Sequence, residues 1–198
     1  MQPDQILPLI GFIFAMVGTP GPNNLMLMAA GANFGFRRSL PHIMGISVGC
    51  QTLLLAIALG LGQLLDTYPL AVTTLRIAGS LFLLNMAVQL LRSHPVAMAQ
   101  AEGAQPLTFW QAALFQWINP KAWMMTITAI ATFANPAQFM LSTLIIGGLF
   151  LVLALLLNSA WNVGGVALKS WLQQGHRLVR FNRVMAVLLL GSLYPLLT

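Results

Sequence analysis

Long apolar runs occupy most of this chain, and they constrain its fold more than any other feature. Of its 198 residues, 58% are hydrophobic and 6% are charged, and the mean hydropathy is +0.83. A soluble domain normally carries about a quarter charged residues, so this chain could not cover its surface in water. The runs are continuous rather than alternating, which argues against a β-barrel and predicts transmembrane helices. The sequence therefore predicts an all-α polytopic membrane protein.

Six apolar segments are predicted to be transmembrane helices. They cover approximately residues 5–33, 41–65, 70–91, 109–133, 138–162 and 181–197. The stretch 93–108 is the most polar in the chain and is predicted to link two halves, 1–92 and 109–198, of a single transporter-like domain spanning residues 1–198. A mixed basic and apolar stretch, 165–180, is predicted to lie at the cytoplasmic membrane surface.

The distribution of basic residues predicts the orientation. With the N-terminus outside, the loops after the first, third and fifth helices face the cytoplasm. Those loops and their margins contain Arg37, Arg38, Arg92, Lys169, Arg177, Arg180 and Arg183. The turns at 66–69 and 134–137 contain no Lys or Arg, as the positive-inside rule requires of external loops. Both termini are thus predicted to lie outside. Because the net charge of +6 is spread between apolar runs, a nucleic-acid partner is not expected.

Two of the six segments are interrupted near their middle. The first contains Thr19-Pro20-Gly21-Pro22-Asn23-Asn24, and the fourth contains Ile118-Asn119-Pro120-Lys121. Proline has no backbone N–H, so the carbonyls of Met16, Gly18 and Gln116 are expected to lose their helical partners. Gly21 permits backbone angles that end a helix, and Asn23 and Asn24 are expected to cap the helix that restarts there.

The two breaks lie at corresponding places in the two halves. Pro20 and Pro120 are about one hundred residues apart, half of the chain. Each half has three helices, an odd number, so similar halves would be related by inversion across the membrane. Broken helices at matching positions in inverted repeats are typical of transport sites near the bilayer midplane.

The ends of the half-helices predict a receptor for a zwitterion. Helix N-termini present N–H groups that suit a carboxylate, and helix C-termini present carbonyls that suit an ammonium group. Lys121 would add a positive charge beside the carboxylate; alternatively it snorkels or pairs with the free carbonyls. The candidate binding residues are Thr19, Pro20, Gly21, Pro22, Asn23, Asn24, Gln116, Asn119, Pro120 and Lys121. No catalytic residue, metal or cofactor is expected.

Ionisable side chains are scarce in the predicted helix cores. None of them is acidic, so a substrate with a cationic side chain would find no buried partner, and neutral amino acids are favoured. Proton coupling through a buried carboxylate has no candidate either. His42 could titrate or could be an interfacial residue, and Arg76 either reaches the outer interface or belongs to an outer gate.

Several other polar and aromatic residues have two interpretations. The run 158–162, Asn-Ser-Ala-Trp-Asn, either lines a pathway or ends a helix at the interface. Trp117 and Trp123 flank the second break and either wall the site or pack against neighbouring helices. Cys50 is the only cysteine, so it cannot form an internal disulfide and is predicted to be a small packing residue.

Four motifs together resemble the lysine-exporter (LysE/RhtB) family, and the resemblance covers essentially the whole chain. They are Thr19-Pro20-Gly21-Pro22-Asn23, the pair Gly45 and Gly49, Asn119-Pro120-Lys121-Ala122, and Arg180-Phe181-Asn182-Arg183. The resemblance implies a bacterial inner-membrane, secondary-active exporter of amino acids or their derivatives, driven by the proton motive force. The chain departs from the family where some members carry an acid, at Asn23 or Asn24, and where Val184 and Met185 replace a common Gly.

Other classes of protein remain as alternatives. A membrane enzyme is disfavoured because the predicted cores hold no metal cluster, acid pair or nucleophile–base arrangement. A passive channel, or an accessory membrane subunit without transport, is the alternative to an exporter. A homodimer in the bilayer is expected, and the pairs Gly31/Gly35 and Gly45/Gly49 could serve contacts within or between protomers.

Overall fold

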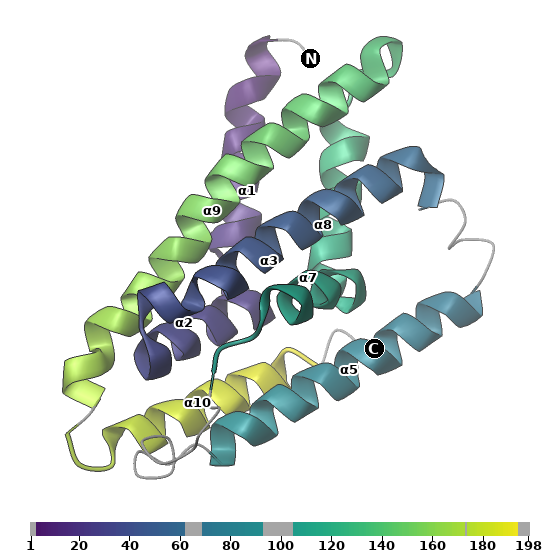
Figure 1. The fold of residues 1–198 in the computed structure, drawn as a ribbon. Coiled ribbons are helices and arrows are strands. Elements are labelled where there is room, and N and C mark those ends of the chain that lie inside the picture. The colour runs from purple at the N-terminus through teal and green to yellow at the C-terminus, as the bar shows by residue number, and fades with distance from the viewer. Residues whose placement is uncertain (1–2, 62–68, 93–104, 173, 194–198) are drawn as a thin grey trace.

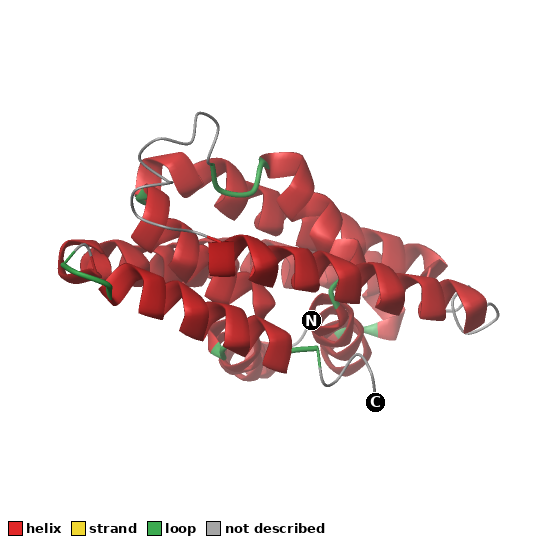
Figure 2. Ribbon diagram, turned by 90° about the horizontal axis from the view of Figure 1, so that it is seen from below, coloured by secondary structure: helices red, strands yellow, loops and turns green. Residues whose placement is uncertain are grey.

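The structure, a computed structural model, describes residues 3–61, 69–92, 105–172 and 174–193. Every regular element within these ranges is a helix, as Figure 2 shows. Three helical segments are long and apolar enough to cross a membrane, namely Phe36–Leu61, Thr73–Arg92 and Pro136–Leu172. The bent pair Ile6–Gly18 and Pro22–Phe34 makes a fourth if it counts as one span. The predicted all-α membrane architecture is thus confirmed at this level.

The described residues form the following helical elements. In chain order they are η1 (Pro3–Gln5), α1 (Ile6–Gly18), α2 (Pro22–Phe34), α3 (Phe36–Ala56), η2 (Ile57–Leu61), α5 (Pro69–Arg92), α7 (Phe109–Ile118), α8 (Pro120–Phe133), η3 (Pro136–Gln138), α9 (Phe139–Leu172) and α10 (Arg177–Gly191). In Figure 1, α5 and α10 lie side by side along one edge, and α1 and α8 lie toward the opposite edge. Helices α2, α3 and α7 lie between them, and α9 packs along both α1 and α2.

The two larger clusters of buried apolar side chains in the described residues hold most of the helices together. One is built mainly from α1, α3, α8 and α9, and the other from α2, α5, α7 and α10. Large apolar side chains such as Leu7, Trp110 and Leu156 are exposed on the outer surface. An apolar exterior of this kind suits contact with lipid rather than with water.

Both predicted helix breaks are present. α1 and α2 are bent by 61°, and α7 and α8 are separated by Asn119 alone. In each case a proline starts the second half-helix, Pro22 in α2 and Pro120 in α8. Proline suits the first helical position because its missing N–H would have no intrahelical partner there.

The second apolar helix begins earlier than predicted. α3 starts at Phe36 rather than near residue 41, so Arg37 and Arg38 lie in its first turn instead of in a loop. Gly35 separates α2 from α3 with a positive φ of 85°, and Pro41 lies inside the helix. Pro41 leaves the Arg37 carbonyl without its helical partner. This is tolerated because Arg37 is exposed and lies near the start of the helix.

The end of the chain also differs from the prediction. α9 continues to Leu172, so residues 165–172 are part of a long helix rather than a separate interfacial segment. α10 begins at Arg177, four residues before the predicted start. The predicted turn at Asn135-Pro136 is present as η3, whereas the turn at 66–68 and residues 93–104 of the linker lie outside the described residues. The rest of the linker leads into α7, where Thr108 and Gln111 form a capping box.

Glycines bring pairs of helices into backbone contact. A Cβ on Gly31 of α2 would lie 2.0 Å from the Asn162 carbonyl oxygen, and one on Gly165 of α9 would lie 2.0 Å from the Met28 carbonyl oxygen. A Cβ on Gly45 or Gly49 of α3 would likewise clash with a backbone carbonyl oxygen of α7, that of Phe109 or Ala113. Small residues allow such close helix approach in membranes, and here Gly31, Gly45 and Gly49 serve contacts within one protomer.

Gly165→Ala is expected to destabilise the fold, because the added methyl group would clash with the Met28 carbonyl. Overpacking of this kind costs about 1–3 kcal/mol, which should appear as a lower thermal unfolding midpoint of the detergent-purified protein. Gly164→Ala is the matched control, since a Cβ there meets nothing within 4 Å. Equal midpoints for the two variants would show that α2 and α9 are not in close contact.

Candidate functional site

The two helix breaks are joined directly by side chains. The Lys121 ammonium at the start of α8 donates to the Thr19 carbonyl oxygen at 2.7 Å and to the Thr19 hydroxyl at 3.1 Å. Asn23 of α2 and Gln116 of α7 exchange two amide hydrogen bonds, of 2.8 and 3.1 Å. The breaks of the two halves therefore form one polar centre.

Side chains satisfy several carbonyls at the end of α1, including that of Met16, which was predicted to be free. The Thr19 hydroxyl donates to the Met16 carbonyl at 3.2 Å. The Asn24 amide donates to the carbonyls of Val17 and Thr19, at 2.7 and 2.8 Å. The prediction that Asn23 and Asn24 cap α2 is wrong, because Gly21 is the capping residue and both asparagines lie inside the first turn. Asn24 instead reaches back to cap the preceding half-helix.

The second break is satisfied in a similar way. The Gln116 carbonyl, predicted to be free, accepts the Asn119 N–H at 3.4 Å. The Asn119 side chain accepts the Lys121 N–H at 3.2 Å, so it caps α8. The Trp123 indole N–H donates to the Trp117 carbonyl at 2.8 Å. Both tryptophans pack against the apolar cluster of α1, α3, α8 and α9, and neither lines the cavity described below. Of their two interpretations, the geometry favours packing.

The start of α2 differs from the start of α8 because no side chain caps it. Its ladder of backbone hydrogen bonds begins with Leu25 N–H to the Gly21 carbonyl, so the N–H groups of Asn23 and Asn24 precede the ladder. The Lys121 side chain lies against Gly21, with its Nζ 3.0 Å from the position of a Cβ. Helix N-termini and ammonium groups both attract anions, so positive potential is concentrated at this point.

A cavity of about 40 Å³ lies beside this polar centre, with room for a few water molecules. Its polar wall is formed by side chains from both breaks and from α3 and α9, namely Asn23, Asn24, Ser47, Gln51, Asn119, Lys121 and Asn158. Its apolar wall includes Met16, Ile46, Met125 and Phe150. A cavity with one polar and one apolar side suits a small molecule that has both characters.

The predicted site residues divide into two groups. Those that line the cavity are Gly21, Asn23, Asn24, Asn119 and Lys121. The others shape the breaks: Pro20, Pro22 and Pro120 interrupt the helices, and Thr19 and Gln116 hold them together. Gln116 is fully buried and also contacts Asn119 and the Cys50 thiol. The structure therefore gives this second group a supporting place around the cavity.

Residues of α3 and α9 complete the cavity, and most of them were not predicted. Ser47, Cys50 and Gln51 are polar or polarisable residues within an apolar helix, and their spacing places them on one side of α3. Asn158 lines the cavity, as one interpretation of the 158–162 run proposed, whereas Asn162 donates to the Leu27 carbonyl at 2.8 Å. The Asn158 side-chain Nδ2 is buried without a hydrogen-bond partner.

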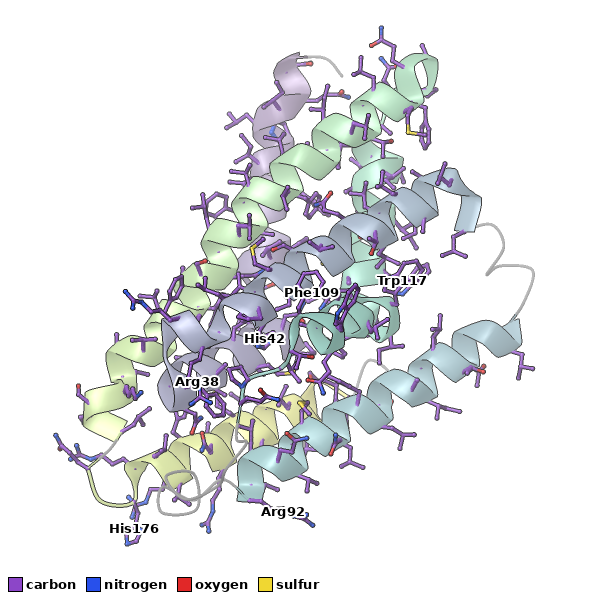
Figure 3. The ribbon with its side chains drawn as sticks, viewed as in Figure 1. Arg38, His42, Arg92, Phe109, Trp117 and His176 are labelled. Carbon is purple, nitrogen blue, oxygen red and sulfur yellow. The ribbon has the colours of Figure 1, made fainter. Side chains whose placement is uncertain are left out.

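The structure also places the other residues that the sequence analysis singled out. Cys50 is buried, as expected of a packing residue, but it also lines the cavity. Arg76 is exposed on α5. Figure 3 shows His42 inside the helix bundle, whereas Arg92 and His176 point outward. His42 is 1% exposed, so its interpretation as an interfacial residue is wrong.

Comparisons with known proteins identify the family. The family described as "LysE type translocator" matches residues 14–193. The chain belongs to the LysE family. Its relatives include the cysteine/O-acetylserine efflux proteins of Escherichia coli strain K12 and Shigella flexneri, each 30% identical over 176 residues and covering 86% of both chains. The protein of the same name from Escherichia coli O139:H28 is 29% identical over 177 residues, with 87% of both chains covered. No solved structure matches this chain.

Membership of the LysE family confirms the resemblance drawn from the four motifs. Together with the apolar helices, it identifies the chain as a multi-pass membrane protein. The matched region contains both breaks and every residue that lines the cavity. The cavity is thus part of the LysE-type translocator unit.

Trp123→Phe is expected to weaken the second break, because it removes the indole N–H that satisfies the Trp117 carbonyl. Loss of one such hydrogen bond costs about 0.5–1.5 kcal/mol, measurable as a lower unfolding midpoint in detergent. Trp110→Phe provides the control, since Trp110 is 71% exposed. If both variants unfold at the wild-type temperature, the indole contact contributes nothing to the break.

Proposed function

We propose that this LysE-family protein exports small neutral amino acids, which bind as zwitterions between the two helix breaks. The observation that carries the proposal is the meeting of the breaks at a cavity with concentrated positive charge and an unpartnered amide donor. Relatives named for cysteine and O-acetylserine efflux support it. Both of those molecules are small amino acids without a cationic side chain.

The substrate carboxylate would bind at the uncapped start of α2, between the Asn23 and Asn24 N–H groups and the Lys121 ammonium. Asn158 would donate its unpartnered Nδ2 hydrogen to the same carboxylate. In the structure the Lys121 ammonium donates to the Thr19 carbonyl oxygen, next to the end of α1, where the substrate ammonium group was expected to bind. Binding would therefore draw Lys121 toward the carboxylate and release this carbonyl for the substrate ammonium.

The cavity wall indicates which side chains the substrate could carry. The described residues that line it include no carboxylate, so a cationic side chain would be buried without a partner, at a high cost. Met16, Ile46, Met125 and Phe150 form an apolar surface that suits a short, uncharged side chain. These features favour neutral over basic amino acids.

The membrane arrangement belongs to the same proposal. The chain would cross the bacterial inner membrane six times as two inverted halves, 1–92 and 109–198, with both termini outside. The proton motive force would drive export, and a homodimer in the lipid bilayer would be the assembled form. The matching prolines at the starts of α2 and α8 support the inverted halves, and the positive-inside pattern supports the orientation.

Lys121→Met is expected to lower export roughly 10- to 100-fold, because one hydrogen bond to the substrate's charged carboxylate is lost. The measurement is efflux of a panel of radiolabelled amino acids from cells, with and without an uncoupler. O-Acetylserine and serine should leave faster than lysine, and the uncoupler should slow them.

Lys169→Met is the control for this change, because Lys169 lies in the last turn of α9, away from the residues that line the cavity. Wild-type efflux by Lys121→Met would remove Lys121 from the site. Efflux that is insensitive to the uncoupler and equal for all substrates would indicate a passive channel instead. Purified Lys121→Met should elute as a monodisperse species and lose substrate-induced thermal stabilisation.

Asn158→Leu is expected to weaken substrate binding while leaving the fold intact. Its Nδ2 has no partner to lose, but it would no longer donate to the carboxylate, which should raise the apparent KM about tenfold or more. Saturation kinetics in proteoliposomes measure this effect. The control is Thr143→Val, because the Thr143 hydroxyl is also a buried, unpartnered group on α9 but does not line the cavity. An unchanged KM for Asn158→Leu would place the substrate elsewhere.

A further inference from the structure

A second cavity lies at the other end of α2, beside α3, α5 and the segment that leads into α7. It has a volume of about 100 Å³, larger than the first. Its wall includes Ala30 and Asn33 of α2, His42 of α3, Gln89 of α5 and Gln105. In the proposed orientation this cavity lies on the cytoplasmic side of the helix breaks.

His42 is an unusual residue in the wall of this cavity. Both of its ring nitrogens are buried and have no hydrogen-bond partner. Buried polar atoms nearly always have one, and an exception needs an explanation. Asn33, on the same wall, does have partners, the Ala29 carbonyl and the Asn182 side chain. The imidazole thus faces space that a water molecule could enter, without a protein group to hold it.

The ionisable groups around His42 are few. α2, α7 and residues 105–108 contain none. On α3, Arg37 and Arg38 precede it, and the Arg38 guanidinium lies over the Phe34 ring at 5.5 Å. α5 carries Arg76 and Arg92 within its bounds, while His94 and Glu102 lie outside the described residues. In the described part of the chain, therefore, no carboxylate adjoins the second cavity.

Helix α3 connects His42 with the proposed substrate site. Ile46 and Cys50, four and eight residues further along α3, line the first cavity, and this spacing places all three on one side of the helix. α2 makes the same connection, with Asn23 at the first cavity and Met26 at the second. A movement of α2 against α3 would therefore change both cavities together.

We propose that His42 is the proton-carrying residue that couples export to the proton gradient, a proposal that rests on the proposed function. Histidine is the side chain that gains and loses a proton near neutral pH. A charged imidazole without a partner is unfavourable in the dry arrangement of the structure, so protonation would favour a state in which water enters the second cavity. His42 would take one proton that has entered from outside and release it to cytoplasmic water, returning to the neutral imidazole. Each cycle then moves one proton inward for one substrate outward.

The test separates net transport from exchange in proteoliposomes of the full chain, with radiolabelled O-acetylserine as the probe. Exchange of labelled for unlabelled substrate needs no proton movement, whereas net flux driven by an imposed pH gradient does. His42→Gln should lower the gradient-driven flux by roughly tenfold or more and abolish the accompanying proton flux, measured with an enclosed pH-sensitive dye. Its exchange should stay within about twofold of the wild type. Gln105→Ala, a non-titrating change in the same wall, should preserve both activities.

Several results would overturn the proposal. If His42→Gln lowers exchange and gradient-driven flux in parallel, His42 is a structural or lining residue. If the gradient-driven flux of His42→Gln equals that of the wild type, His42 has no coupling role. Wild-type exchange with no proton flux would refute proton coupling and leave the exporter function intact, whereas absence of exchange for every amino acid would refute the exporter function itself. His42→Asn is tested in parallel in case His42→Gln does not fold, and an absence of wild-type proton flux refutes the proposal without either variant.

Discussion

The whole site depends on one constraint, that backbone polar groups inside a membrane must find partners within the protein. Two helices of this chain are interrupted by proline, which leaves several carbonyls without the N–H groups that would normally pair with them. The structure satisfies these carbonyls with side chains: Asn24 at Val17 and Thr19, the Trp123 indole at Trp117, and Lys121 at Thr19. Because Lys121 belongs to the other half of the chain, the same contact also joins the two breaks. A polar centre suited to a charged solute follows from the need to satisfy the backbone.

Small residues decide where this polar centre sits. Gly31 and Gly165 bring α2 against α9, and Gly45 and Gly49 bring α3 against α7. Helix α3, like α2, lines both cavities, with Cys50 in the wall of the first cavity and His42 in the wall of the second. Close packing transmits displacement because packed helices move as rigid units. The arrangement therefore links a candidate binding site to a candidate proton site without a continuous row of ionisable residues.

The fold was more predictable than the contacts. Pro22 and Pro120 act through local chemistry, the loss of one N–H, and both breaks were predicted where they occur. The start of α3 was predicted too late in the chain, because Gly35 rather than Pro41 separates α3 from α2. Asn24 was expected to cap its own helix, but it caps the preceding one, since a bend of 61° brings the two half-helices within reach. Ser47, Gln51 and Asn158 could have been suspected from their polarity inside apolar helices, although polarity alone does not show which cavity a side chain faces.

The amino-acid sequence by itself determined the helical membrane architecture, the positions of the breaks and the family, because hydropathy and proline chemistry act over neighbouring residues. Tertiary structure alone decided that Lys121 bonds to Thr19, that Gln116 pairs with Asn23 across 93 residues, and that His42 is buried without a partner. These relations depend on the packing of helices distant in sequence. Burial and pairing are properties of neighbours in space, and local residue patterns do not specify such neighbours.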